Sequence, residues 1–301
     1  MSELFRTPDA WASLPSRTAE RVGSVRALLG EGPTWDAERG VVWWVDITGR
    51  QIHATSLDGR DRALHVARPL AVVVLRASGG LLGATPDGFV AVDTETGALT
   101  LLAPVELDDP ATRMNDGKVD PTGRFWAGTM FDSGDPGGGA LYRLDADLRV
   151  TRMLKPVSIA NGLDWTDDDR GMLYIDTTTR RVDLIEYDAV TGDLGARRPW
   201  VTIPDGAGHP DGMTLDSEGC AWVALWGAGC VVRFSPAGVP LTRVDVPAQQ
   251  TSSCCFAGPG LDQLVITTAS GPNPETAGAG AGGLYVARPG VRGRLPTAFA
   301  G

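Results

Sequence analysis

One short pattern recurs along this chain and restricts its fold more than any other feature. A turn containing glycine or aspartate precedes a short apolar strand, and the turn residue recurs every 40 to 48 residues, at Gly40, Gly80, Gly123, Gly171, Gly219 and Asp262. A second strand follows each time, as in "RQIHATSLDG" and "GFVAVDTETG". Repeats of this length, with roughly four strands in each, are typical of a β-propeller.

The pattern between the turns agrees with strands. Alternating segments such as Val-Asp-Leu-Ile-Glu-Tyr predict strands, and no window carries a long helical period. The 39 glycines and 21 prolines argue against a solenoid of helix pairs. We therefore predict an all-β fold, a six-bladed β-propeller forming a single domain over residues 21–301, after an N-terminal extension over residues 1–20.

Composition excludes several classes of partner. A net charge of −10 argues against nucleic acid, and no apolar run approaches the roughly 18 residues of a membrane span. The N-terminus lacks a basic segment followed by an apolar one, so no secretory signal is expected. Four cysteines without CxxC spacing suit buried, reduced thiols in a cytoplasmic protein. A closed propeller buries its core without a partner, so a monomer is compatible with the sequence.

Polar residues stand eight to ten positions ahead of the turn in four of the six repeats. They are Glu31, Asn115, Asn161 and Asp211. The second and sixth repeats offer no acid or amide at that level. In a propeller these segments are the inner strands, whose leading loops gather at one mouth of the central channel. Residues far apart in sequence would therefore converge there.

Carboxylates and amides that point into one channel would repel one another or stay unsatisfied unless a positive group sat between them. The oxygen-bearing set Glu31, Asn161 and Asp211 favours one hard divalent cation such as Ca²⁺, Mg²⁺ or Mn²⁺, and Zn²⁺ or Fe²⁺ remains compatible. The alternative is structural, because Asn-Gly and Asp-Gly pairs form turns. Each residue taken singly suits that alternative, whereas matched positions in separate repeats favour a shared site.

Five stretches, spread in order over nearly the whole chain, carry a family resemblance. They are "GEGPTW", "RMNDGKVDPTGRFWAGTM", "IANGLDW", "PDGM" and "TSSCCFAG". With them the chain resembles the regucalcin/gluconolactonase family (the senescence marker protein family) of six-bladed propeller lactonases. The resemblance implies a divalent metal held by Glu31, Asn161 and Asp211, and a sugar lactone hydrogen-bonded by Arg113 and Asn115. Asp116 is expected to satisfy the loop backbone.

One position departs from the family pattern. Where some members carry a substrate-contacting Glu after "GTM", this chain has Ser133, and the preceding Asp132 would be the group able to compensate. Substrate preference is the property that this change affects.

The resemblance implies metal-dependent hydrolysis of an aldonolactone (glucono-, xylono-, arabino- or galactonolactone) to the aldonic acid. Asp211 is the candidate to accept the proton of the attacking water. Two alternatives stay open, namely a non-catalytic calcium-binding propeller and an enzyme that cleaves a non-sugar ester.

Overall fold

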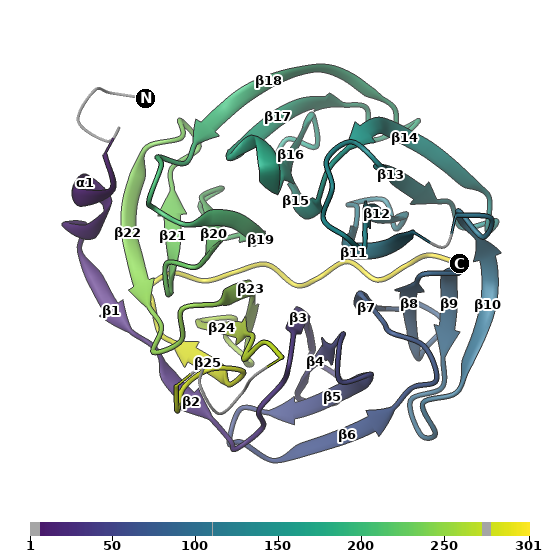
Figure 1. Ribbon diagram of the computed structural model, residues 1–301, viewed down its shortest axis with the longest axis horizontal. Coiled ribbons are helices and arrows are strands. Elements are labelled where there is room, and N and C mark those ends of the chain that lie inside the picture. The colour runs from purple at the N-terminus through teal and green to yellow at the C-terminus, as the bar shows by residue number, and fades with distance from the viewer. Residues whose placement is uncertain (1–6, 110, 273–277) are drawn as a thin grey trace.

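The computed structural model describes residues 7–109, 111–272 and 278–301, and its strands form six sheets around a central channel (Figure 1). Within each blade neighbouring strands run antiparallel from the channel to the rim, apart from one added edge strand of blade 5. The predicted six-bladed β-propeller is therefore confirmed.

The first three blades follow the chain in order. Blade 1 contains β3 (Gly30–Asp36), β4 (Val41–Asp46), β5 (Gln51–Ser56) and β6 (Asp61–His65). Blade 2 contains β7 (Val72–Leu75), β8 (Leu81–Thr85), β9 (Gly88–Val92) and β10 (Leu99–Pro104). Blade 3 contains β11 (Thr112–Val119), β12 (Phe125–Phe131), β13 (Gly139–Leu144) and β14 (Val150–Val157).

The last three blades complete the ring, and blades 5 and 6 also take a strand each from the beginning of the chain. Blade 4 contains β15 (Ala160–Trp165), β16 (Gly171–Asp176), β17 (Arg181–Tyr187) and β18 (Leu194–Thr202), with the short 3-10 helix η2 (Thr177–Thr179) after β16. Blade 5 contains β19 (His209–Leu215), β20 (Ala221–Trp226), β21 (Cys230–Phe234) and β22 (Pro240–Asp245). Blade 6 contains β23 (Thr251–Ala257), β24 (Gln263–Thr268) and β25 (Leu284–Ala287).

The N-terminal segment closes the ring. β2 (Glu20–Val22) pairs antiparallel with β25, so the two ends of the propeller share blade 6. β1 (Ser16–Thr18) pairs in parallel with β22 and adds a fifth strand to blade 5, after the short helix α1 (Pro8–Ala12). Part of the segment that the sequence assigns to an N-terminal extension is thus paired with the blades.

The repeated turns are held by buried acids at the ends of inner strands. Asp120 Oδ2 accepts a hydrogen bond of 2.9 Å from Trp126 Nε1, and Asp216 Oδ2 accepts one of 2.9 Å from Trp222 Nε1. Each of these acids also accepts from backbone N–H groups of its own turn. This arrangement satisfies backbone donors of the turn together with the indole N–H of a tryptophan ring that is fully buried.

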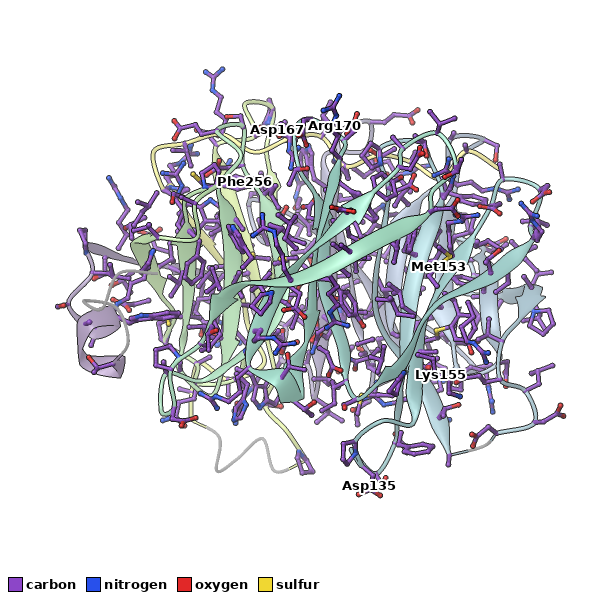
Figure 2. All side chains as sticks on the ribbon, turned by 90° about the horizontal axis from the view of Figure 1, so that it is seen from above. Asp135, Met153, Lys155, Asp167, Arg170 and Phe256 are labelled. Carbon is purple, nitrogen blue, oxygen red and sulfur yellow. The ribbon has the colours of Figure 1, made fainter. Side chains whose placement is uncertain are left out.

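A C-terminal strap, residues 294–299, crosses the channel and docks on the far side of the ring (Figure 1). There Phe299 is fully buried, and its backbone N–H donates to Leu75 O at 2.8 Å. Arg294 Nη1 lies 2.6 Å from Asp167 Oδ1. Figure 2 shows Asp167 and Asp135 on opposite faces, so the strap closes the channel on the face away from the Asp135 loop.

The cysteine prediction is confirmed, since Cys220, Cys230, Cys254 and Cys255 are all buried and free of disulfides. Among the described residues, no helix has the length and apolar character needed to cross a membrane.

Candidate functional site

Most inner strands are irregular at the same level of the channel. The register shifts between Glu31 and Thr34 in β3, and equivalent shifts occur in β11, β15, β19 and β23. The register of β7, whose repeat lacks an acid or amide, is unbroken. Bulges re-aim side chains and are common beside functional sites. The irregular level coincides with the residues that the sequence selects.

Two of the selected carboxylates, those of Glu31 and Asp211, are buried, and no lysine or arginine among the described residues hydrogen-bonds either of them. Glu31 is 5% exposed, and its Oε2 accepts from Gly32 N at 3.2 Å. Burial raises the pKa of Glu31 well above its usual range, and the charges of Asp211 and Asp116 raise it further. Burial and the charge of Asp116 likewise raise the pKa of Asp211. The structure therefore brings Glu31 and Asp211 together in a strongly negative environment.

Asn161 is oriented by the neighbouring blade. Its Nδ2 donates to Thr177 Oγ1 at 2.8 Å, and Thr177 Oγ1 donates to Pro210 O at 2.9 Å, directly before Asp211. Asn161 is 5% exposed, and its Oδ1 is buried with no hydrogen-bond partner in the described part of the chain. A buried carbonyl oxygen held in this way is costly unless a donor or a cation binds it.

The glycine after Asn161 permits the close approach of blades 4 and 5. A Cβ atom on Gly162 would lie 2.6 Å from Asp211 O, too near for any side chain. Glycine is required here because the two inner strands meet through their backbones. The Asn-Gly pair thus serves strand packing and not only a turn.

Asp116 has a larger place in the site than the sequence interpretation gives it. As expected, its Oδ1 accepts a backbone hydrogen bond, from Gly117 N at 2.7 Å. It is also buried, and burial raises its pKa to about 6, with Lys118 acting against the shift. Its charge raises the pKa values of both Glu31 and Asp211. One signal in the sequence could have revealed Asp116, because it stands directly before a glycine, as Glu31, Asn161 and Asp211 do. In the structure the strand β11 also has a bulge directly before Asp116.

Arg113 and Asn115 lie together on β11. Arg113 Nη1 donates to Asn115 Oδ1 at 2.8 Å, and Asn115 Nδ2 donates to Ala160 O of blade 4 at 2.8 Å. Arg113 also acts electrostatically on Glu31 and lowers its pKa. The guanidinium therefore stands beside the acidic cluster, within reach of the same ligand.

Ser133 is placed apart from this group. Its Oγ donates to Asp135 Oδ2 at 2.9 Å, and the residue is exposed in the loop after β12. Asp132, one residue earlier, pairs with Arg113 through an Nε–Oδ1 distance of 3.1 Å. The structure thus joins Asp132, and not Ser133, to Arg113.

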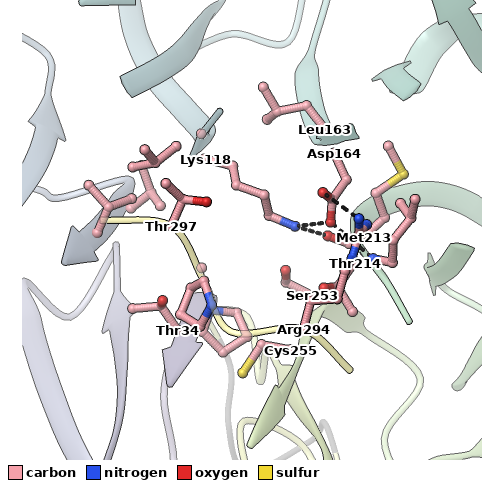
Figure 3. A pocket seen from close by; sticks show the side chains of 18 of the residues that line it. Thr34, Lys118, Leu163, Asp164, Met213, Thr214, Ser253, Cys255, Arg294 and Thr297 are labelled. Carbon is pink, nitrogen blue, oxygen red and sulfur yellow. Dashed lines mark hydrogen bonds and ion pairs between the residues drawn. The ribbon is translucent and has the colours of Figure 1, made fainter. Parts of the chain in front are cut away.

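A cavity of about 200 Å³ lies deeper in the channel, between the acidic cluster and the strap (Figure 3). Asp116 is the member of the cluster that lines it, with Lys118, Asp164 and Ser253 further in. Lys118 Nζ donates to Asp164 Oδ2 and to Met213 O, both at 2.8 Å. Although burial opposes it, the charges of Lys118 and Arg294 hold the pKa of Asp164 below its usual value.

The donor set around Asn161 fits a hard divalent cation. No three His, Cys, Asp or Glu side chains of the described residues gather closely enough to hold a metal ion. A cation would therefore need the amide oxygen of Asn161 beside Glu31 and Asp211. That oxygen is unpartnered, and all three groups offer the oxygen donors that such ions prefer.

Known proteins of similar sequence match almost the whole length of this chain. Regucalcin of Xenopus laevis is 38% identical over 94% of this chain and 98% of its own length. Pentonolactonase XacC of Haloferax volcanii is 37% identical over 87% of this chain and 89% of its own length. The putative sugar lactone lactonase YvrE of Bacillus subtilis is 34% identical, over 92% and 96%.

Solved structures agree with the fold. The crystal structure of a calcium-binding protein, regucalcin, from Agrobacterium tumefaciens superposes with a TM-score of 0.89 at 31% identity and covers 95% of this chain and 98% of that one. The model of the SMP-30/Gluconolactonase/LRE-like region matches residues 29–270, which include all the candidate residues described above. The chain belongs to this SMP-30/gluconolactonase family.

Proposed function

We propose that this protein is a divalent-metal-dependent lactonase that opens a sugar lactone to its aldonic acid. One observation carries the proposal. Glu31, Asp211 and the unpartnered Oδ1 of Asn161 meet, buried, at a channel mouth beside Arg113 and Asn115. Relatives named sugar lactone lactonase and pentonolactonase support the lactone as substrate, and the calcium-binding neighbour supports a divalent cation.

Glu31, Asn161 and Asp211 would hold the cation. When bound, such an ion polarises the ester carbonyl and makes a water molecule more acidic. The raised pKa values of Glu31 and Asp211 belong to the protein without a cation, and a positive charge between them favours their ionised forms.

Side chains of this protein carry out the remaining steps. Asp211 accepts the proton as the water oxygen bonds to the carbonyl carbon. The bond between that carbon and the ring oxygen then breaks, and the proton returns to the departing oxygen, which becomes the hydroxyl of the open acid. Arg113 and Asn115 hold ring hydroxyls and so orient the ester for attack. Burial of the acids keeps bulk water away from them.

The test is lactone hydrolysis by metal-stripped protein. Glucono-, xylono-, arabino- and galactonolactone are each offered with Ca²⁺, Mg²⁺, Mn²⁺, Zn²⁺ or Fe²⁺ added in turn. We expect at least one ion to restore turnover, and Asp211→Ala to reduce kcat/KM by about 10³-fold or more. Asp147→Ala, in the exposed turn between β13 and β14, is the matched control.

Two results would redirect the proposal. Tight cation binding without turnover on any ester would favour a calcium-binding propeller, as the name of the Agrobacterium structure suggests for that protein. Turnover confined to esters without sugar hydroxyls would favour a different hydrolase, since Arg113 and Asn115 would then have no partner.

A further inference from the structure

In each blade that supplies a proposed cation ligand, the residue directly before that ligand is tied to the preceding blade of the ring. Its backbone carbonyl oxygen accepts a hydrogen bond from a side chain of that blade. In blade 1 the residue is Gly30, before Glu31, and Ser252 Oγ of the adjacent blade 6 donates to Gly30 O at 2.5 Å (Figure 1 shows the two blades). Ser252 is fully buried, and it is the residue that the register shift of β23 leaves out of the regular pairing.

The same contact recurs between blades 3 and 4. Ala160 O, directly before Asn161, accepts a hydrogen bond of 2.8 Å from Asn115 Nδ2. Asn115 resembles Ser252 in its position, because it too is the residue left out of the pairing by a register shift in the inner strand of its blade. The bulge of one inner strand thus reaches the start of the next bulge around the ring.

A third contact of this kind joins blades 4 and 5. Pro210 O, directly before Asp211, accepts a hydrogen bond of 2.9 Å from Thr177 Oγ1. Thr177 is itself held in place, since its backbone N–H donates to Ile159 O at 3.1 Å. A hydroxyl has one proton, and that proton goes to Pro210 O, so Thr177 Oγ1 acts as the acceptor for Asn161 Nδ2 at 2.8 Å. One side chain therefore holds two of the proposed ligands.

A hydrogen bond to such a carbonyl fixes the ligand that follows it. The peptide unit is planar, so the carbonyl oxygen of one residue and the N–Cα bond of the next move together. The three ligands stand on three different sheets, and their spacing therefore depends on contacts between blades. Contacts that orient the ligands of a metal, without touching the metal, commonly govern its affinity.

We propose that Ser252 and Thr177 are positioning residues, which set the spacing of Glu31, Asn161 and Asp211 through the carbonyls directly before two of them. Asn115 makes the third contact in addition to its proposed role toward the substrate. The inference rests on the proposed function, because it concerns the cation that this function requires. It adds two hydroxyl residues that would touch neither the ion nor the lactone.

Calorimetry of calcium binding to the metal-stripped protein tests the proposal. We expect Ser252→Ala and Thr177→Val each to raise the Kd for Ca²⁺ by about 10-fold or more. Thr177→Ser keeps the hydroxyl and should retain the affinity of the unaltered protein. If Ser252→Ala does not fold, the comparison of Thr177→Val with Thr177→Ser decides the matter.

Each position has a matched control. Ser270 is also a buried serine, and its Oγ donates to Ala27 O at 2.8 Å, a carbonyl that precedes no proposed ligand. Thr179 lies in the same turn as Thr177, and its Oγ1 donates to Asp176 O at 2.7 Å. Ser270→Ala and Thr179→Val lose hydrogen bonds of the same kind, and both should leave the Kd for Ca²⁺ unchanged.

Terbium gives a second readout that a general loss of stability would not change. Tb³⁺ is a hard cation that binds oxygen ligands, and its luminescence lifetimes in H₂O and D₂O report how many water molecules are bound to it. Water replaces a protein oxygen that is moved away. Ser252→Ala and Thr177→Val should therefore hold Tb³⁺ with about one water molecule more than the unaltered protein does. Thr177→Ser and the two controls should show no increase.

The outcomes separate this inference from the lactonase function. Equal weakening of calcium binding by Ser252→Ala and Ser270→Ala, or unchanged affinity in both Ser252→Ala and Thr177→Val, would overturn the inference and leave the lactonase function standing. Cation binding that depends on Ser252 and Thr177, in a protein that hydrolyses no lactone, would support the inference and overturn the function. If the unaltered protein binds neither calcium nor terbium, the inference is wrong together with the proposed cation.

Discussion

Two groups of buried acids occupy the same channel and differ in how their charge is balanced. Glu31, Asp116 and Asp211 form the group at the mouth, and burial raises the pKa of each. Deeper in, the Asp164 side chain is 15% exposed, and its pKa is lowered because Lys118 Nζ lies 2.8 Å from its Oδ2. The two groups are linked through β11, because Asp116 of the first group and Lys118, the partner of Asp164, stand two residues apart on that strand.

The difference separates a group whose charge the chain itself balances from a group whose charge it leaves unbalanced. At Asp164 the chain supplies the cation, and Leu215 N and Trp165 N supply further donors at 2.9 and 2.8 Å (Figure 3 shows the lysine contacts). At the mouth no lysine or arginine of the described residues hydrogen-bonds Glu31, Asp116 or Asp211. A buried carboxylate is stable only with a partner, so the group at the mouth is the one suited to a cation from outside.

The largest effect is expected from breaking the ion pair between Lys118 and Asp164. Asp164→Asn should lower the free energy of unfolding by about 3 kcal/mol, because it leaves the half-buried Lys118 beside the cavity without its counter-ion. Urea denaturation measures this. The double variant Lys118→Met with Asp164→Leu should recover most of the loss, since both charges are then gone. A loss in the double variant larger than in the single one would contradict this explanation.

Binding of a divalent cation to the acids at the mouth should have the next largest effect. Addition of the preferred divalent cation to metal-stripped protein, at about 100 times its Kd, should raise the free energy of unfolding by about 2.7 kcal/mol. Thermal unfolding with and without the ion gives the value. Asp164→Asn should show the same gain, while Asp211→Ala should show little. Equal gains in all three proteins would place the ion elsewhere.

The pH dependence of the metal-stripped protein should reveal the group at the mouth. Its carboxyl pKa values lie above the ordinary value of about 4, that of Asp116 at about 6. The folded state therefore holds more protons than the unfolded state within that window. Stability should fall as pH rises, by about 1 to 2 kcal/mol between pH 5 and 8.

Urea denaturation at the two pH values, with and without the cation, tests this prediction. The lowered pKa of Asp164 affects stability only at more acidic pH, so it does not mask the effect. With the cation bound, the trend should weaken or reverse, because ionised carboxylates bind the ion. Stability that rises with pH in the stripped protein would be the contradicting result.

The smallest expected effect is a change in stability whose sign distinguishes the two groups of acids. Glu31→Gln removes one of three repelling carboxylates and should stabilise the metal-stripped protein, by about 1 kcal/mol. The same change should weaken cation binding in calorimetry. Asp164→Asn, which also neutralises a buried acid, should destabilise. If both variants destabilise the stripped protein, the two groups do not differ as described.

The repeat pattern predicted the fold correctly because every blade must solve the same local problem. Asp120 and Asp216 each satisfy a turn and a buried tryptophan within six residues of sequence, so the pattern is visible without the structure. The matched positions of Glu31, Asn161 and Asp211 were visible for the same reason. Ser133 was chosen by counting along the chain, and the structure instead places Asp132 beside Arg113.

Sequence alone determined which polar groups reach the inner strands, because the turn and strand patterns that place them are local. Only the tertiary structure decided which ion-pair and hydrogen-bond partners those groups have. Lys118 meets Asp164 46 residues away and Met213 95 residues away, and Asn115 reaches Ala160 across 45 residues. The protonation and partners of a buried charge depend on such approaches between blades, and no local pattern encodes their distances.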